Sequence, residues 1–482
     1  LITISISLIC EEIYVERLKY PFPYAVVDSS LTTFLSERPP NLIKYFMSAF
    51  LIGIIFGIIA YLPPALGFQL IPLPYLDFTW IIQEILPGGL LGITTVLSAY
   101  MGGMVVPFNI AVYAFITSCI IWLVLNSLFV TTFPEVSPKW AAEYMKGMGL
   151  LSIQNRAWLR VWFPFQVGFT LAATIFLILF KARTPLISAL SQLFREIRKK
   201  ERRVSHLPSL RFSFSLYLIS GVLGVLLFKW LVPEIPLWLP ILFSLGLNLL
   251  LGILQTNLLG VSGQMANIPL AWYWVAFVYT TPYQGYAGYH FTPPLYNSSG
   301  AGFSQQVTVA YRLNTKPSDL LKVWILGGVL SLFSGLLSLN FLWSVAPIPS
   351  SAYPYTIFDC IQSAYSDALT VTRELEFSFH TVIIPAIILF IILSVGDLIS
   401  SKTGLVFSSL GVILGLFINI QSAIAILAGS AVAKFLLPRI LKEKSMELIG
   451  YIIAGELSGE GLIMMISVGF SLLYKSAWLW PW

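Results

Sequence analysis

Long apolar runs dominate the pattern of hydrophobic and polar positions along the chain. Each extends for about 18 residues or more, which is enough to cross roughly 30 Å of hydrocarbon as a helix. The runs lack the alternating character of transmembrane β-strands. Because a helix satisfies its own backbone hydrogen bonds in lipid, the pattern predicts an all-α, polytopic integral membrane protein with about twelve or more spans. The expected spans are Asn41–Leu62, Ile81–Tyr100, Val105–Val130, Leu159–Phe180, Phe212–Leu231, Leu237–Leu254, Ile268–Thr280, Leu320–Val345, Thr381–Leu398, Gly404–Ile418, Gln421–Leu437 and Leu448–Leu473.

Composition supports a lipid environment. The 482 residues are 57% hydrophobic and only 10% charged, which leaves too little polar surface to cover a soluble globule. The first ten residues are also apolar, but this run is too short to span and lacks the basic start of a signal peptide. Since no initiating Met precedes the run, we expect the chain to be N-terminally incomplete.

Basic residues are concentrated in one loop, which predicts orientation. Only Glu196 and Glu201 oppose them there, and the tendency of basic loops to stay inside the cell places this loop in the cytoplasm. A loop of this kind is ordinary between spans, so nucleic acid is not an expected partner. The loop divides the chain into an expected first unit, 1–211, and second unit, 212–482. Its basic residues are Lys181, Arg183, Arg195, Arg198, Lys199, Lys200, Arg202, Arg203 and Arg211.

Cysteines and histidines are too few for a cofactor or metal site. The chain has three cysteines, which are far apart, and three histidines, which form no pair at helical spacing. No Gly-rich phosphate loop, metalloprotease motif or nucleophile elbow is present in the sequence. We therefore expect neither a cofactor, nor a metal, nor an enzyme.

A short motif recurs and indicates an internal repeat. The sequence PYAVVD at Pro23–Asp28 returns as PYTIFD at Pro354–Asp359, an offset of 354 − 23 = 331 residues. An apolar run beginning at Asn109 also aligns with one beginning at Gln421. Two repeats in a polytopic chain are typical of secondary transporters, whose halves rock about a site at their interface.

Two segments are predicted to be broken or re-entrant and to approach one another around a cavity. The first is Pro21–Asp28, where two prolines interrupt the chain, and the second is Gly260–Pro269. Irregular backbone at membrane depth is tolerated where it is buried in protein or lines a watery cavity. Asp28 is then either the cap of a restarted helix or a cavity-lining group. The candidate substrate-binding residues of these segments and of the tyrosine-rich stretch that follows are Tyr24, Asp28, Ser262, Gln264, Asn267 and Tyr286.

Ionisable groups inside spans are costly and are functional candidates. Glu456 and Glu460 are four residues apart, so they share one helix face, and two glycines beside them allow close helix packing. Two carboxyl groups about 6 Å apart in low dielectric cannot both ionise cheaply, which favours proton coupling. A structural or interfacial role is the alternative. Asp359 is a third proton-coupling candidate because it repeats Asp28.

The motifs together resemble the oligopeptide transporter family, which includes prokaryotic peptide carriers and plant metal-chelate carriers. The resemblance runs through YPFPYAVVDS, TNLLGVSGQMANIPLAW, SLGVILGLFINIQSAIAILAGSAVAKFL and YIIAGELSGEGLIMM and spans nearly all of the chain. Tyr24 stands where the family has a small residue, and the signature motifs of the eukaryotic members are absent. The resemblance therefore implies a prokaryotic-type member.

Three functions follow as hypotheses. The first is proton-coupled uptake of small peptides by alternating access in the plasma membrane. A homo-oligomer is one assembly open to such a carrier. The second is transport of a metal chelate or siderophore. The third, from another class, is a non-catalytic membrane subunit of a larger complex.

Overall fold

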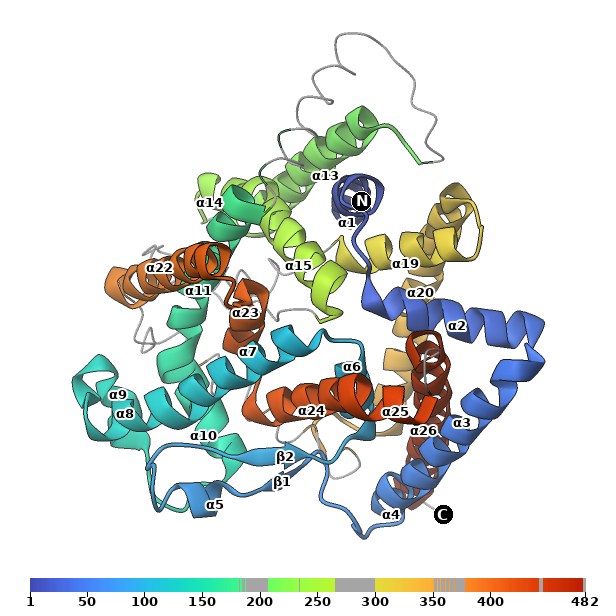
Figure 1. Ribbon diagram of the computed structural model, residues 1–482, viewed down its shortest axis with the longest axis horizontal. Helices are drawn as coiled ribbons and strands as arrows, with labels where there is room; N and C mark the ends of the chain where they lie inside the picture. Colours follow the sequence, from blue (N-terminus) through green and yellow to red (C-terminus); the bar gives the residue numbers. More distant parts are fainter. Residues whose placement is uncertain are drawn as a thin grey trace.

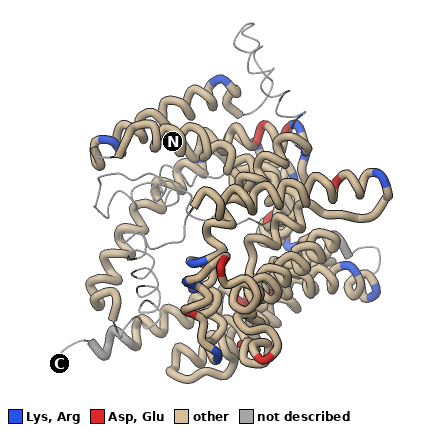
Figure 2. Tube along the Cα trace, turned by 90° about the vertical axis from the view of Figure 1, so that its left-hand side faces the viewer, with Lys and Arg blue, Asp and Glu red and all other residues tan. Residues whose placement is uncertain are grey.

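The computed structural model describes residues 1–181, 207–233, 235–264, 300–350, 378–441 and 445–479, together with residues 183, 187, 353, 356, 360, 364 and 368. Helices make up most of this part, and long stretches of them carry no charged residue (Figure 2). An all-α membrane architecture is thereby confirmed. The predicted span Ile268–Thr280 lies outside the described residues, as do Asn267, Tyr286 and Asp359.

The first part of the chain forms two helical stretches separated by a break, followed by one long helix (Figure 1). The elements are α1 (Ile2–Glu11), the π-helical segment η1 (Glu12–Arg17), α2 (Pro23–Glu37), α3 (Pro40–Ala60) and α4 (Leu62–Ala65). The chain then reaches a two-stranded antiparallel hairpin, β1 (Tyr75–Asp77) and β2 (Gly92–Thr94), with α5 (Thr79–Ile82) between the strands.

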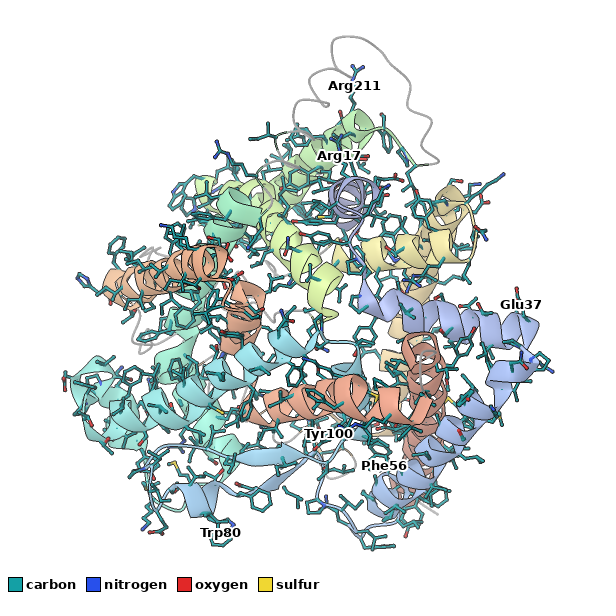
Figure 3. The ribbon with its side chains drawn as sticks, viewed as in Figure 1. Arg17, Glu37, Phe56, Trp80, Tyr100 and Arg211 are labelled. Carbon is teal, nitrogen blue, oxygen red and sulfur yellow. The ribbon has the colours of Figure 1, made fainter. Side chains whose placement is uncertain are left out.

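The helices that follow the hairpin complete the first half. They are α6 (Leu97–Met104), α7 (Phe108–Cys119), η2 (Ile120–Leu125), α8 (Asn126–Thr131), η3 (Pro134–Val136), α9 (Pro138–Glu143), α10 (Leu150–Ala157), η4 (Trp158–Trp162), α11 (Phe163–Phe176) and η5 (Leu177–Lys181). Trp80 lies at the hairpin, and Arg211 lies at the start of α13 (Leu210–Leu231). The two residues are at opposite ends of the view (Figure 3).

The second half contains longer helices. They are α13 (Leu210–Leu231), α14 (Trp238–Ile241), η6 (Leu242–Leu247), α15 (Asn248–Ser262), α19 (Ala301–Arg312), α20 (Pro317–Val345), α22 (Phe379–Thr403), α23 (Ser409–Phe417), α24 (Ile420–Ala431), η7 (Val432–Leu436), α25 (Leu437–Leu441) and α26 (Ser445–Leu479).

Nine helical segments within the described residues are long and apolar enough to cross a membrane, and each overlaps a span predicted from the sequence. They are Pro40–Ala65, Phe108–Thr131, Leu150–Lys181, Leu210–Leu231, Trp238–Ser262, Pro317–Val345, Phe379–Thr403, Ile420–Leu441 and Leu448–Tyr474. Nine segments that could each cross the bilayer make the chain a multi-pass membrane protein.

Two predicted spans are wrong. The run Ile81–Tyr100 is not a helix, because Pro87 and a left-handed Gly88 break it, and it forms one strand of the hairpin before α6 begins. The run Gly404–Ile418 is shortened to the nine residues of α23, because Gly404 adopts a left-handed conformation that ends α22. At about 1.5 Å per residue, α23 is too short to cross the hydrocarbon.

The two short helices α6 and α23 pack reciprocally. α6 lies against α24 of the other half, and α23 lies against α7. The Ser118 hydroxyl on α7 donates to the Ile418 carbonyl oxygen at 3.2 Å, and the Ser430 hydroxyl on α24 donates to the Val106 carbonyl oxygen at 2.7 Å. The two bonds join equivalent positions, since 430 − 118 = 312 and 418 − 106 = 312. This is also the offset between Asn109 and Gln421, whose runs align in the sequence.

Candidate functional site

The first proline segment is a break between two helices, as predicted. The helical stretch before the break ends at Arg17, and α2 begins at Pro23. Phe22, between them, has a φ of 40°. Proline is favoured at the first position of a helix because its missing N–H costs nothing there. The Phe22 N–H donates to the Gly260 carbonyl oxygen on α15 at 3.0 Å, so the two predicted segments do approach one another.

The second segment breaks at Gly263, while Gly260 lies inside α15. Gly263 has a φ of 70°, a conformation that side chains rarely adopt, and ends the helix. Ser262 is fully buried, and its hydroxyl donates to the Leu258 carbonyl oxygen at 2.6 Å and accepts from the Gln264 N–H at 3.1 Å. These contacts make Ser262 a stabiliser of the helix end. The rest of this segment lies outside the described residues.

Tyr24 and Gln264 come together at α6. The Tyr24 hydroxyl and the Gln264 side-chain nitrogen both lie beside Gly102, where a side chain would collide with the hydroxyl. The Tyr24 ring also lies on Gly263. The two candidate substrate-binding residues therefore face the same point, where α2, α15 and α6 meet.

Asp28 lies within α2 and not at its start, so the helix cap, one of its two predicted roles, is wrong. The helix begins five residues earlier, at Pro23, without a side-chain cap. The Asp28 carboxylate accepts from the Gln305 side-chain nitrogen at 2.8 Å and from that of Gln306 at 3.3 Å. Both glutamines are on α19, so Asp28 joins the broken segment to the second half.

Glu460 is buried in α26 and bound by two donors. Its Oε1 accepts from the Tyr61 hydroxyl at 2.5 Å, and its Oε2 accepts from the Ser98 N–H at 3.1 Å. Tyr61 follows α3, and Ser98 is in the first turn of α6. A carboxylate held by two donors can be retained in an apolar interior, because its desolvation is partly offset.

Glu456 is fully buried, and neither of its carboxyl oxygens has a hydrogen-bond donor among the described residues. It lies one helical turn before Glu460, and the two carboxyl groups are close enough to interact. A buried carboxyl without a donor is costly in its charged form. The pair can therefore hold one proton between two carboxyl groups.

Close packing of α3 on α26 creates this burial. Gly455 lies on the Phe46 carbonyl oxygen, Gly459 lies on that of Phe50, and Gly53 of α3 lies on the Glu456 backbone. A side chain at any of these glycines would collide with backbone atoms. The glycines next to the carboxylates thus do bring a neighbouring helix close, as the sequence predicts.

A cavity of about 730 Å³ lies directly beyond the glutamates. Tyr61 forms part of its wall, together with α4 and the chain before β1. On α26 the wall is formed by Met464, Ser467, Val468, Ser471 and Leu472. The Tyr61 side chain therefore lies in the cavity wall and also contacts Glu460.

Several of these contacts were not found from the sequence. Tyr61 resembles an ordinary interfacial tyrosine after an apolar run, and Ser98 contributes only its backbone. Gln305 and Gln306 are adjacent amides outside the apolar runs, so no hydropathy signal indicated them. A further acidic candidate inside a span, Asp397, is paired with Lys181 at 2.7 Å.

Among the described residues, nine helical segments able to span a bilayer, broken helices and buried carboxylates define a polytopic membrane protein with the features that transporters use. A family model described as OPT oligopeptide transporter protein matches residues 1–471, and the chain therefore belongs to this family. The family consists of transporters and not enzymes. No curated protein matches the chain.

Proposed function

We propose that the chain is a secondary active transporter that takes up small peptides across the plasma membrane, driven by protons. Membership of the family establishes transport of oligopeptides or similar molecules. Proton coupling, the direction of transport and the substrate are the proposed part.

The carboxyl pair on α26 is the observation that carries proton coupling. Glu460 is bound by Tyr61 and Ser98, whereas Glu456 has no donor among the described residues. A proton that binds here neutralises a group in low dielectric, and its release restores a buried charge. Binding and release therefore change the local free energy by about 2–3 kcal/mol, enough to bias two conformations.

The reciprocal packing of α6, α7, α23 and α24 supports alternating access. The matched hydrogen bonds of Ser118 and Ser430 are expected if the halves are repeats related by an approximate two-fold axis. In such transporters, one repeat rocks against the other around a fixed site. We place the repeats at 1–211 and 212–482, with Asp359 equivalent to Asp28.

We place the substrate where α2, α6, α15 and α19 meet. Tyr24 and Gln264 provide a hydroxyl and an amide that can bind peptide groups, and Asp28 provides a negative charge for an amino terminus. Ser262 holds the backbone of this site, and Asn267 and Tyr286 complete it in the proposal. A metal chelate with amino and carboxylate groups would fit the same chemistry.

Proteoliposome uptake tests the proposal. A labelled peptide library is offered with and without an inward proton gradient, and metal chelates are added as competitors. The E456Q/E460Q double variant keeps the shape of both side chains but removes their titration. We expect gradient-driven accumulation to be lost while exchange of substrate without a gradient continues.

The control is S458A, which changes a side chain of the same helix whose hydroxyl bonds only to its own backbone, at Ala454. If the folded double variant still concentrates peptide on a gradient as well as the parent, the glutamates are structural. Coupling would then be sought at Asp28, Asp359 or Asp397. Competition by chelates but not by peptides would overturn the peptide assignment.

A further inference from the structure

The face of α26 that carries the glutamates continues into the cavity. Glu456, Glu460, Met464, Ser467 and Ser471 follow one another at intervals of three or four residues, so they form a single stripe along the helix. The first two are buried, and the last three line the cavity of about 730 Å³. One helix face thus leads from the carboxyl pair to an open space large enough for many water molecules.

The Tyr61 and Ser471 hydroxyl groups are borne by residues that line this space. Ser467 lines it too, but its hydroxyl oxygen is enclosed by protein atoms and has no hydrogen-bond partner among the described residues. Polar groups need a hydrogen-bond partner, and ordered water provides one where a cavity is large enough. Water in the cavity would therefore contact the wall at Tyr61 and Ser471.

Tyr61 connects the cavity to the carboxyl pair. Its side chain lines the cavity, and its hydroxyl donates to Glu460 Oε1. A hydroxyl group can donate one proton while accepting another, so a tyrosine in this position can relay protons and remain neutral. The other helices packed on α26 present no free ionisable side chain to the pair among those described: α6 gives the Ser98 N–H, and Asp28 of α2 is held by Gln305 and Gln306.

We propose that the cavity is a water-filled vestibule through which Glu460 exchanges protons, with Tyr61 as the relay. A protonated water in the cavity gives a proton to the Tyr61 oxygen as the Tyr61 hydroxyl gives its own proton to the Glu460 carboxylate. The tyrosine ends neutral, the water returns to its neutral form, and the carboxylate becomes a carboxylic acid. Release follows the same path in reverse. The inference rests on the proposed coupling role of the glutamates.

The first test removes the relay alone. Y61F keeps the ring in the wall and deletes the hydroxyl. Y45F deletes a hydroxyl from α3, the helix that ends just before Tyr61. We expect Y61F to lower the rate of proton-driven uptake by about 10²-fold, the usual contribution of a positioned proton donor, and to leave gradient-free exchange nearly unchanged. Y45F should resemble the parent in both assays.

The second test measures whether the cavity is accessible to water. Cys10, Cys119 and Cys360 are replaced by alanine, and S471C is treated with a charged, membrane-impermeant thiol reagent. We expect S471C to react and its proton-driven uptake to be blocked, whereas M465C, on the exposed apolar face of α26, should not react.

The outcomes separate the two proposals. If the E456Q/E460Q variant keeps its proton coupling, the coupling role proposed for the glutamates fails, and this inference fails with it. If E460Q loses coupling but Y61F retains the parent's uptake rate, the relay is overturned while the function stands. If S471C reacts no faster than M465C, the cavity is not a water vestibule and the inference is wrong.

Discussion

Two pairs of long helices share one packing geometry and differ in chemistry. In the first pair, Gly459 of α26 lies against the Phe50 carbonyl oxygen and the Ile54 nitrogen of α3. In the second pair, Gly168 of α11 lies against the Val382 carbonyl oxygen and the Ala386 nitrogen of α22. Each glycine fits between residues four apart, so the pairs can be compared position by position. The offsets are 382 − 50 = 332 for one helix and 459 − 168 = 291 for the other.

At equivalent positions, polar groups in one pair replace apolar groups in the other. Glu460 corresponds to Phe169 and Glu456 to Phe165, since the residue numbers in each pair differ by 291, the offset between α26 and α11. Tyr61 corresponds to Leu393, at an offset of 332. Ser98, at the offset of 312 that relates α6 to α23, corresponds to Leu410. The apolar set is continuous: Phe169 and Leu393 belong to one buried cluster, and Phe165 and Leu410 pack against it.

The difference teaches that this packing geometry does not need carboxylates. At the matched positions, the pair α11 and α22 is held by glycine contact and apolar side chains, and its ion pair, Lys181 with Asp397, lies several turns from the Gly168 contact. Because burying ionisable groups is costly, their presence in α26 needs a reason other than helix packing. This supports the proposal that Glu456 and Glu460 serve transport.

The largest expected effect comes from placing a carboxylate in the apolar pair. F169E removes a large buried ring and leaves a carboxyl group facing Leu393 and Leu410 without the donors that Tyr61 and Ser98 provide in the other pair. We expect it to lower the free energy of unfolding by about 3–5 kcal/mol. The measurement is thermal unfolding of detergent-purified protein, with F169L as the conservative control.

A stable F169E variant would contradict the comparison, because the apolar pair would then tolerate a carboxyl group as readily as α26 does. The burial of Glu456 and Glu460 would then need no functional reason. F169L should stay within about 1.5 kcal/mol of the parent, as volume-conserving changes in a core usually do.

An intermediate effect is expected at the two matched glycines. G168A and G459A each place a methyl group against backbone atoms of the facing helix, and overpacking of this kind costs about 1–3 kcal/mol. We expect similar losses in the two pairs, measured by unfolding in the same detergent. G461A is the matched control, because nothing lies near this glycine on α26 and alanine favours a helix. A loss at only one of the two glycines would show that the pairs are not equivalent.

The sequence predicted most spans because a long apolar run leaves little choice in lipid. It failed at Ile81–Tyr100, where average hydropathy concealed the turn at Pro87 and Gly88. The hairpin there depends on contacts distant in sequence: Asp77 accepts from the Thr79 N–H and the Leu150 N–H, each at 2.8 Å. No local pattern encodes the second of these bonds.

The candidate site was predictable to the extent that its chemistry is local. Glu456, Glu460 and the glycines beside them stand out in one run, and the Pro23 break follows from proline alone. Their partners, Tyr61 at Glu460 and Gln305 at Asp28, come from helices far along the chain. A single sequence does not indicate which helices meet, so these partners required the structure.

The smallest expected effect separates the two glutamates and distinguishes function from packing. Glu456 has no donor among the described residues, and its equivalent, Phe165, is apolar. E456M removes a costly buried carboxyl group and fills its space with a flexible apolar side chain, so we expect the protein to be unchanged in stability or up to about 1 kcal/mol more stable. E460M, in contrast, leaves the Tyr61 hydroxyl and the Ser98 N–H without their acceptor and should cost about 1–3 kcal/mol. Unfolding of both variants in one detergent, beside gradient-driven uptake, gives the comparison.

A stable E456M variant that no longer concentrates substrate would mean that the Glu456 carboxyl group is retained for transport at the expense of stability. An E456M variant that unfolds as readily as E460M would instead assign Glu456 a structural role.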